Sequence, residues 1–155
     1  MRFRSALFML LLILVSGCSK TATLYPVEGP MSKQFPLPVI TATVDGITGN
    51  TGNISLVLAD GEMCTGRWSS VAPMSVSYSD ISAFGTAKSG LSSAWATIYG
   101  SGFSIANLPG VNRGEAMLVG NKGTVIHVEF YTGSGTASGV GVAKDNKGNI
   151  FKVIF

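Results

Sequence analysis

The stretch EAMLVGNKGTVIHVEFY, residues 115–131, places two runs of apolar and β-branched residues on either side of an Asn-Lys-Gly turn at 121–123. A short polar turn that ends in glycine typically joins antiparallel strands, because glycine readily adopts the left-handed backbone conformation needed there. Glu115–Gly120 and Thr124–Tyr131 are therefore predicted to form a β-hairpin.

The same Asn-Lys-Gly turn recurs at 146–148 and predicts a second hairpin, between Ala137–Lys144 and Asn149–Phe155. The segment 132–135 joins the two hairpins, so four successive strands are expected to form a meander. Short strands at this spacing are typical of all-β proteins. The predicted fold class is therefore an antiparallel meander that forms a small sandwich or barrel.

The first half of the chain follows the same plan. Val39–Val44 alternates in the manner of a strand, and Asp60-Gly61 lies between strands predicted at Ile54–Ala59 and Met63–Ser69. An Asp-Gly pair between two such runs is a strong hairpin signal. A loop rich in glycine and asparagine, residues 47–53, is expected before this hairpin.

If Asp60 and Gly61 are the two loop residues, Val57 lies opposite Cys64. Cys64, Gly66 and Trp68 then share one face of their strand. We expect the Trp68 ring to lie over the bare backbone of Gly66 and to bury Cys64.

The segment from Ile81 to Arg113 contains one helical pattern. Ser89 is a candidate N-cap of a helix at about 90–99 and Gly100 a candidate C-terminal stop, while a strand over 94–99 is the competing interpretation. The predicted apolar face of the helix recurs at helical spacing and consists of Leu91, Ala94, Trp95, Ile98 and Tyr99. We expect the helix to pack over an open end or a face of the sheet.

Gly139, Gly141 and Ala143 present a nearly bare strand face. They do not lie between a strand and a helix start, where a phosphate-binding loop would be found. We expect this face to receive Trp68, Trp95 or a tight bend of a barrel.

The beginning of the chain has the layout of a secretory signal peptide. Arg2 and Arg4 precede an apolar run over residues 6–15, which ends at Ser16 and Gly17 and is followed at once by Cys18. The run of about ten residues is well short of the roughly 20 that a transmembrane helix needs. It is therefore interpreted as a removable signal.

With cysteine at its exit, Val15-Ser16-Gly17-Cys18 resembles the lipobox of bacterial lipoproteins. The resemblance covers only residues 1–18. It implies cleavage between Gly17 and Cys18, a diacylglyceryl group on the Cys18 sulfur, and acylation of the new amino group. Ser19 in place of aspartate resembles the outer-membrane signal of enteric lipoproteins, whereas a lysine such as Lys20 is associated in some bacteria with retention at the inner membrane.

These observations predict three parts: a signal peptide at 1–17, a lipidated tether at 18–38, and one β-rich domain at 39–155. Four of the six prolines lie in the proposed tether, where neither a helix nor a central strand is expected. Removal of the leader leaves 138 of the 155 residues, which is enough for one domain with a sizeable core.

Composition excludes several classes of protein. Charged residues make up 12% of the chain and hydrophobic residues 46%, so the chain is too apolar and too low in net charge for a disordered protein. Two of the 11 lysines and arginines lie in the leader, which leaves nine basic against eight acidic residues without a basic run. Nucleic acid is therefore not an expected partner.

Cofactor and metal sites are not indicated either. Cys18 is assigned to lipid, so Cys64 has no partner within the chain and is expected to be buried rather than to bridge two molecules. One histidine and one remaining cysteine cannot build a zinc site.

His127 and Glu129 are expected on a half-solvated strand surface, opposite the face of Ile126, Val128 and Phe130. No Gly-x-Ser-x-Gly motif accompanies His127, so no catalytic residue is assigned. The predicted function is that of a lipid-anchored, non-catalytic binding or structural protein of the cell envelope, at the outer rather than the inner membrane, with envelope proteins as candidate partners.

Two alternatives remain open. A small-ligand carrier would hold an apolar barrel cavity lined by residues such as Trp95, Phe103 and Phe130, and a hydrolase would place a nucleophile within reach of His127. A structural protein would instead show a filled core and an exposed apolar patch.

Overall fold

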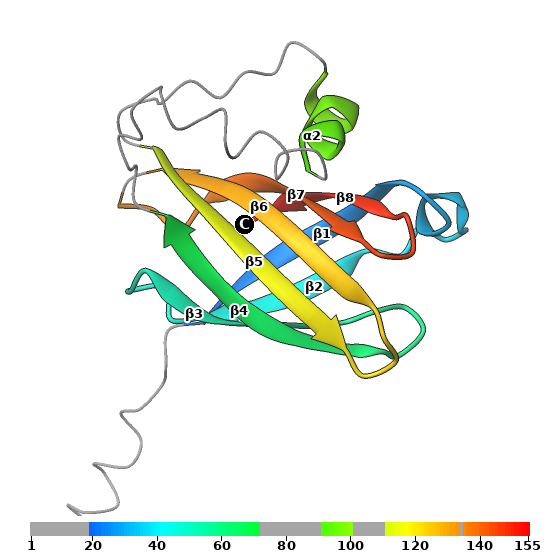
Figure 1. Cartoon of the computed structure of the whole chain (residues 1–155), viewed down its shortest axis with the longest axis horizontal. Coiled ribbons are helices and arrows are strands. Elements are labelled where there is room, and N and C mark those ends of the chain that lie inside the picture. The colour runs from blue at the N-terminus through cyan, green and yellow to red at the C-terminus, as the bar shows by residue number, and fades with distance from the viewer. Residues whose placement is uncertain (1–18, 72–90, 101–110, 134) are drawn as a thin grey trace, which may run out of the picture.

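The computed structural model describes residues 19–71, 91–100, 111–133 and 135–155. Within these ranges, eight antiparallel strands close into one barrel, in which β8 pairs back to β1 (Figure 1). Closure leaves no edge strand unpaired. The predicted all-β antiparallel fold is confirmed, and the barrel is the form that it takes. The strands are β1 (Ser19–Glu28), β2 (Ile40–Asp45), β3 (Thr51–Val57), β4 (Met63–Val71), β5 (Val111–Gly120), β6 (Val125–Gly133), β7 (Gly139–Asp145) and β8 (Ile150–Ile154).

Both Asn-Lys-Gly hairpins are confirmed. They join β5 to β6 and β7 to β8, with Leu118 opposite Ile126 in the first hairpin. Gly123 and Gly148 have φ angles of +94° and +87°, the left-handed conformation that the turn requires.

The β3–β4 hairpin differs from its predicted register by one residue. Leu58 and Glu62 pair through a hydrogen bond of 2.9 Å, so the turn consists of three residues, 59–61, and not of two. Gly61 has a φ of +76°, which suits the last position of such a turn. Cys64 consequently lies opposite Leu56 and not Val57, but it still faces the interior and is fully buried.

The prediction of a proline-rich tether at 18–38 is wrong for residues 19–28, which form β1 of the barrel. Pro26 is tolerated because pairing with β2 ends at Leu24 and the ladder with β8 is irregular between Pro26 and Glu28. A missing backbone donor costs little at such a position. The 3-10 helix η2 (Met31–Lys33) follows β1, and the buried Met31 side chain joins the core.

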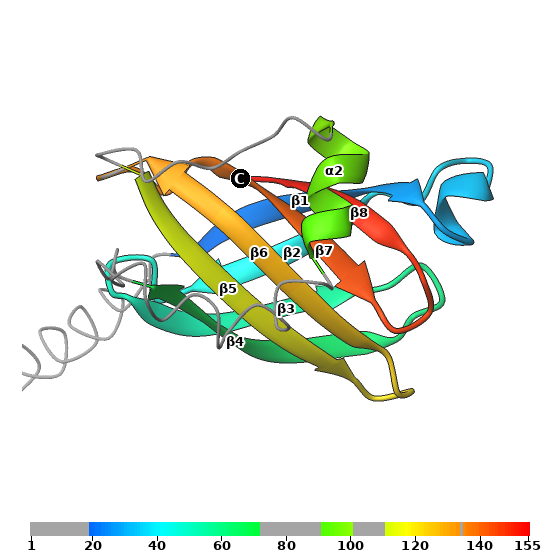
Figure 2. The same ribbon diagram turned by 45° about the horizontal axis from the view of Figure 1, so that its top comes forward.

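The helix α2 (Ser92–Tyr99) confirms the helical interpretation, so the alternative of a strand over 94–99 is wrong. It packs outside the barrel against β7 and β8 (Figure 2), where Ala94 and Trp95 contact Val142 and Ile150. Gly100, with a φ of +90°, ends the helix as predicted, and Ser89 lies outside the described residues. No helix among the described residues is long and apolar enough to cross a membrane.

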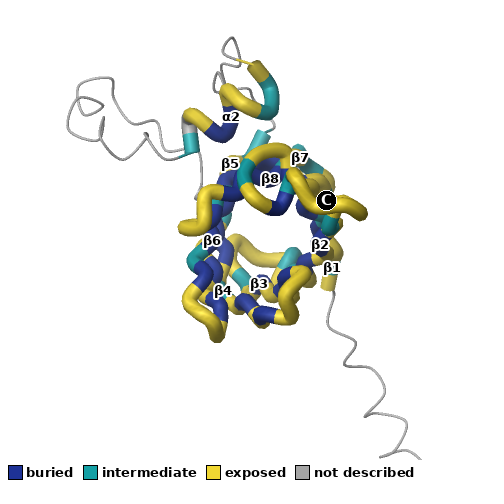
Figure 3. The backbone as a smooth tube through the Cα atoms, turned by 90° about the vertical axis from the view of Figure 1, so that its right-hand side faces the viewer, coloured by how far each residue is buried: buried dark blue, intermediate teal, exposed yellow. Residues whose placement is uncertain are grey.

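The interior of the barrel has two unlike halves. Toward the turns that follow β3, β5 and β7, large side chains such as Phe151, Leu118 and Ile126 are fully buried and fill the core. Figure 3 shows buried positions around the whole ring, with α2 outside it. Toward the other end, where β1 begins and β8 ends, the core is not filled.

Candidate functional site

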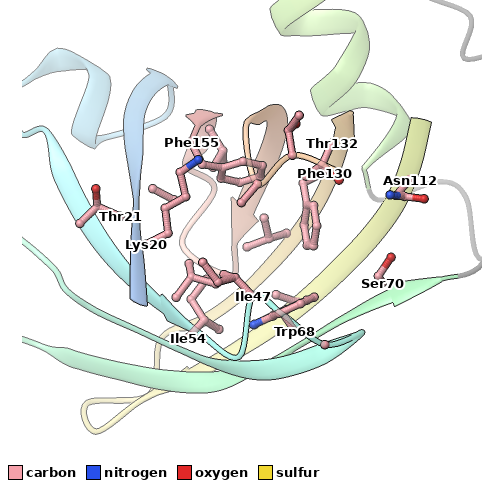
Figure 4. Close-up of a pocket in the computed structure, with 18 of the residues that line it drawn as sticks. Lys20, Thr21, Ile47, Ile54, Trp68, Ser70, Asn112, Phe130, Thr132 and Phe155 are labelled. Atoms are coloured by element: carbon pink, nitrogen blue, oxygen red, sulfur yellow. The ribbon is translucent and has the colours of Figure 1, made fainter. Parts of the chain in front are cut away.

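A cavity of about 410 Å³ occupies the unfilled half of the barrel (Figure 4). A volume in this range is typical of sites for small organic ligands. The cavity is lined by inward-facing residues of the strands and by the loops at 47–50 and 135–137. Its apolar wall includes Ala22, Leu24, Val44, Ile47, Ile54, Leu56, Trp68, Ala116, Val128, Phe130, Val153 and Phe155.

Small inward-facing residues explain why this half is hollow. Ala22 and Ala116 line the cavity, whereas Leu118, two residues farther along β5, belongs to the filled half. Gly114 lies opposite Phe130, and the aromatic ring comes to 2.2 Å from the place that a Cβ of Gly114 would take. A larger residue at 114 would therefore displace the ring from the wall of the cavity.

The Trp68 side chain forms one side of the cavity. Its Nε1 donates a hydrogen bond of 2.8 Å to the backbone oxygen of Asp45, and its ring meets Phe130 edge-on at 6.2 Å between centroids. The predicted packing over Gly66 is wrong. The bare backbone beside the indole is that of Gly52, the residue paired with Trp68, because a Cβ there would lie 2.5 Å from Nε1.

The bare face of β7 receives two phenylalanines and no tryptophan. A Cβ at Gly139 would lie 2.9 Å from the ring of Phe155, and one at Gly141 would lie 3.0 Å from the Cβ of Phe130. Trp95 was proposed as a cavity residue and as an occupant of this face. It belongs instead to the side of α2 that packs against the outside of the barrel. Phe130 lines the cavity as predicted, and Phe103 lies outside the described residues.

Lys20 lines the cavity at its polar end, a position that the tether interpretation missed. It lies opposite Val44 in the register of β1 with β2, and its Nζ donates a hydrogen bond of 3.2 Å to Ser138 Oγ. The alternation of Lys20, Ala22 and Leu24 with threonines is a strand signal, which the nearby prolines obscured. Polar residues on other strands of the same end include Ser70, Asn112 and Thr132.

The other candidate residues lie away from the cavity. His127 is exposed on the outer face of β6, between Met117 and Lys144 of the adjacent strands. Glu129 is buried under α2 and not half-solvated as predicted.

Cys64 is buried as expected. Burial raises the pKa of its thiol, which disfavours the reactive thiolate. Gly17 and Cys18 lie outside the described residues. Within the described ranges, no group of three or more His, Cys, Asp or Glu side chains is arranged to hold a metal ion.

In the described part of the chain, the outer surface carries an apolar strip over β3, β4 and β5. Val57 lies directly opposite Met63, and Met117 and Val119 follow on the next strand. The exposed fraction of each of these four residues lies between 50% and 58%. The molecule therefore combines two features. The interior cavity was expected of a carrier, and the exposed apolar strip was expected of a structural protein.

The fold and the site together define a closed eight-stranded antiparallel β-barrel with an apolar cavity in one half of its interior. Comparison with family models, with curated proteins and with solved structures finds no match for this chain.

Proposed function

We propose that this protein is a lipid-anchored binding protein of the bacterial cell envelope, whose barrel carries a small and largely apolar ligand. The observation that carries the proposal is the cavity of about 410 Å³ inside an otherwise well-packed barrel. Protein interiors are normally close-packed. A hollow of this size, with an apolar wall and polar groups at one end, is typical of a ligand site.

The apolar strip on the outer face is a weaker argument for a purely structural role. Single exposed apolar residues are common on protein surfaces. Nothing in the described residues covers the strip, whereas the cavity combines shape, apolar lining and polar end groups in one place. The carrier alternative is therefore preferred to the structural one, and His127 on the outer face contributes nothing to the cavity.

The lipobox-like stretch ending at Cys18 supports the anchor. Because β1 begins at Ser19, and Lys20 lines the cavity, an acylated Cys18 would be at most about 7 Å of extended chain from that end of the barrel. The polar end of the cavity would then lie close to the lipid headgroups. Such a position suits a ligand that is taken from, or delivered to, the membrane.

The proposal is tested with the fluorescence of Trp68, one of the two tryptophans in the chain. The full-length protein in phosphatidylcholine nanodiscs is titrated with ω-bromododecanol, whose bromine quenches a nearby indole. We expect saturable quenching in a Trp95→Phe variant, which retains Trp68 in the cavity wall. No saturable quenching is expected in Trp68→Phe, because Trp95 lies outside the barrel.

A variant that fills the cavity provides the second measurement. Ala116→Leu adds apolar atoms to the cavity wall and should weaken the binding of ω-bromododecanol by about tenfold or more, because the space is taken. Ala59→Leu makes the same chemical change on an exposed turn and should leave binding unchanged. Non-saturable quenching that is equal in both single-tryptophan variants would contradict the proposal.

A further inference from the structure

The cavity has a single charged side chain among its described lining residues, and that side chain is a cation. Lys20 Nζ has three hydrogens to donate, and the contact with Ser138 Oγ uses one of them. In the described part of the chain, no ion pair involves Lys20. The ammonium group is thus placed at the polar end of an apolar cavity without an anionic partner from the described residues.

The opposite end of the cavity is apolar. Leu24 and Leu56 are nearly fully buried there. Leu24 lies four positions after Lys20 in β1, which corresponds to about 13 Å along a strand. The apolar part of the cavity is therefore long enough for an alkyl chain. The Lys20 ammonium group lies at the other end, where the head group of such a ligand would be.

We propose that the ligand is a long-chain carboxylate, whose head group pairs with Lys20 and whose alkyl chain lies between Trp68, Phe130 and Leu56. This inference depends on the proposed function, since it names the chemical class of ligand for the same cavity. The hydroxyl and amide groups of Ser70, Asn112 and Thr132 provide further hydrogen-bonding groups around the polar end. A charge-assisted hydrogen bond is stronger than a neutral one, so a carboxylate should bind more tightly than an alcohol of the same length.

The test compares ω-bromododecanoate with ω-bromododecanol in the same Trp68 quenching assay, at a pH where the carboxylate is ionised. We expect the full-length protein to bind the carboxylate about tenfold more tightly than the alcohol at low salt. Lys20→Gln should remove this preference, so that the carboxylate and the alcohol bind with similar affinity, whereas Lys20→Arg should retain the preference. Lys33→Gln is the matched control, because Lys33 is exposed in η2 and does not line the cavity.

The outcomes separate this inference from the proposed function. Saturable binding of both probes with equal affinity, or a carboxylate preference that survives in Lys20→Gln, overturns the assignment of the ligand class while the carrier function stands. Failure of both probes to quench Trp68 saturably overturns the carrier function and the ligand class with it.

Discussion

Glu62 is a buried carboxylate that joins three turns at the filled end of the barrel. It accepts hydrogen bonds of 2.9 Å from the backbone N–H groups of Lys122 and Thr124, and a further one from the Thr124 hydroxyl. Lys147 Nζ lies 3.2 Å from its other oxygen. The hydrogen bonds from Thr124, together with those from Lys147 and Lys122, outweigh the effect of burial and lower the pKa of Glu62 to about 2.

This lowered pKa predicts an acid-sensitive contribution to stability. The contribution is complete above the ordinary pKa of a glutamate, about 4.3, and is lost as the pH falls toward the folded value of about 2. Urea midpoints should therefore decrease between pH 5 and pH 2 in the native protein. In Glu62→Gln the midpoint should be lower at pH 7, and the part of the acid dependence due to Glu62 should be absent.

Glu115→Gln is the control for this experiment, since Glu115 is exposed on the outer face of β5. It should change the midpoint at pH 7 little, because exposed charges contribute little to stability. An identical acid dependence in Glu62→Gln and in the native protein would show that Glu62 does not stabilise the fold in this way.

At the scale of one element, α2 is held on the barrel by an aromatic cluster and a buried carboxylate. Trp95 packs against Tyr99 and Tyr131, with ring centroids 5.2 and 5.3 Å apart. Trp95 Nε1 also donates a hydrogen bond of 3.0 Å to Glu129, which pairs with Arg113 at 2.7 Å. Burial, followed by the charge of Glu129, raises the pKa of Tyr131 to about 12, so this hydroxyl stays protonated and donates to Glu129.

We predict that Trp95→Ala loosens α2 without opening the barrel. Removal of a buried tryptophan costs about 3–5 kcal/mol where the site cannot collapse, and here the cost falls on the contacts of the helix with β6, β7 and β8. Hydrogen exchange should increase over residues 92–99, whereas the β3–β4 hairpin, which lies away from α2, should keep its protection. Thr97→Ala, at an exposed position of the same helix, should leave exchange nearly unchanged. Equal loss of protection in α2 and in the barrel strands would contradict the prediction that α2 loosens while the barrel stays closed.

At the scale of the whole molecule, the proposed anchor places a barrel directly after the lipidated residue. We predict that Cys18→Ala abolishes the incorporation of labelled palmitate and releases the protein from the membrane fraction, because one sulfur atom is the proposed attachment site. Cys64→Ala is the matched control and should retain the label, since Cys64 is enclosed in the barrel. Label that persists in Cys18→Ala would refute the attachment site.

The turns and the alternation of residues allowed much of the barrel to be predicted. Gly123 and Gly148 mark hairpins whose strands are neighbours in sequence. The turn residues and the alternation of apolar and polar side chains were therefore sufficient to predict these hairpins. The face of α2 was also predicted, because Ala94 and Trp95 follow helical spacing. The candidate site was predicted only in part, through Phe130.

The amino-acid sequence by itself thus determined the all-β class, the hairpins and the burial of Cys64, since these depend on residues close together in the chain. Only the tertiary structure decided that β1 joins β8, as in the pairing of Leu24 with Val153, and that Lys20 lies at the end of a cavity. Closure depends on pairing between distant segments. The cavity remains because the inward side chains occupy less volume than an eight-stranded barrel encloses. No local sequence pattern encodes that difference in volume.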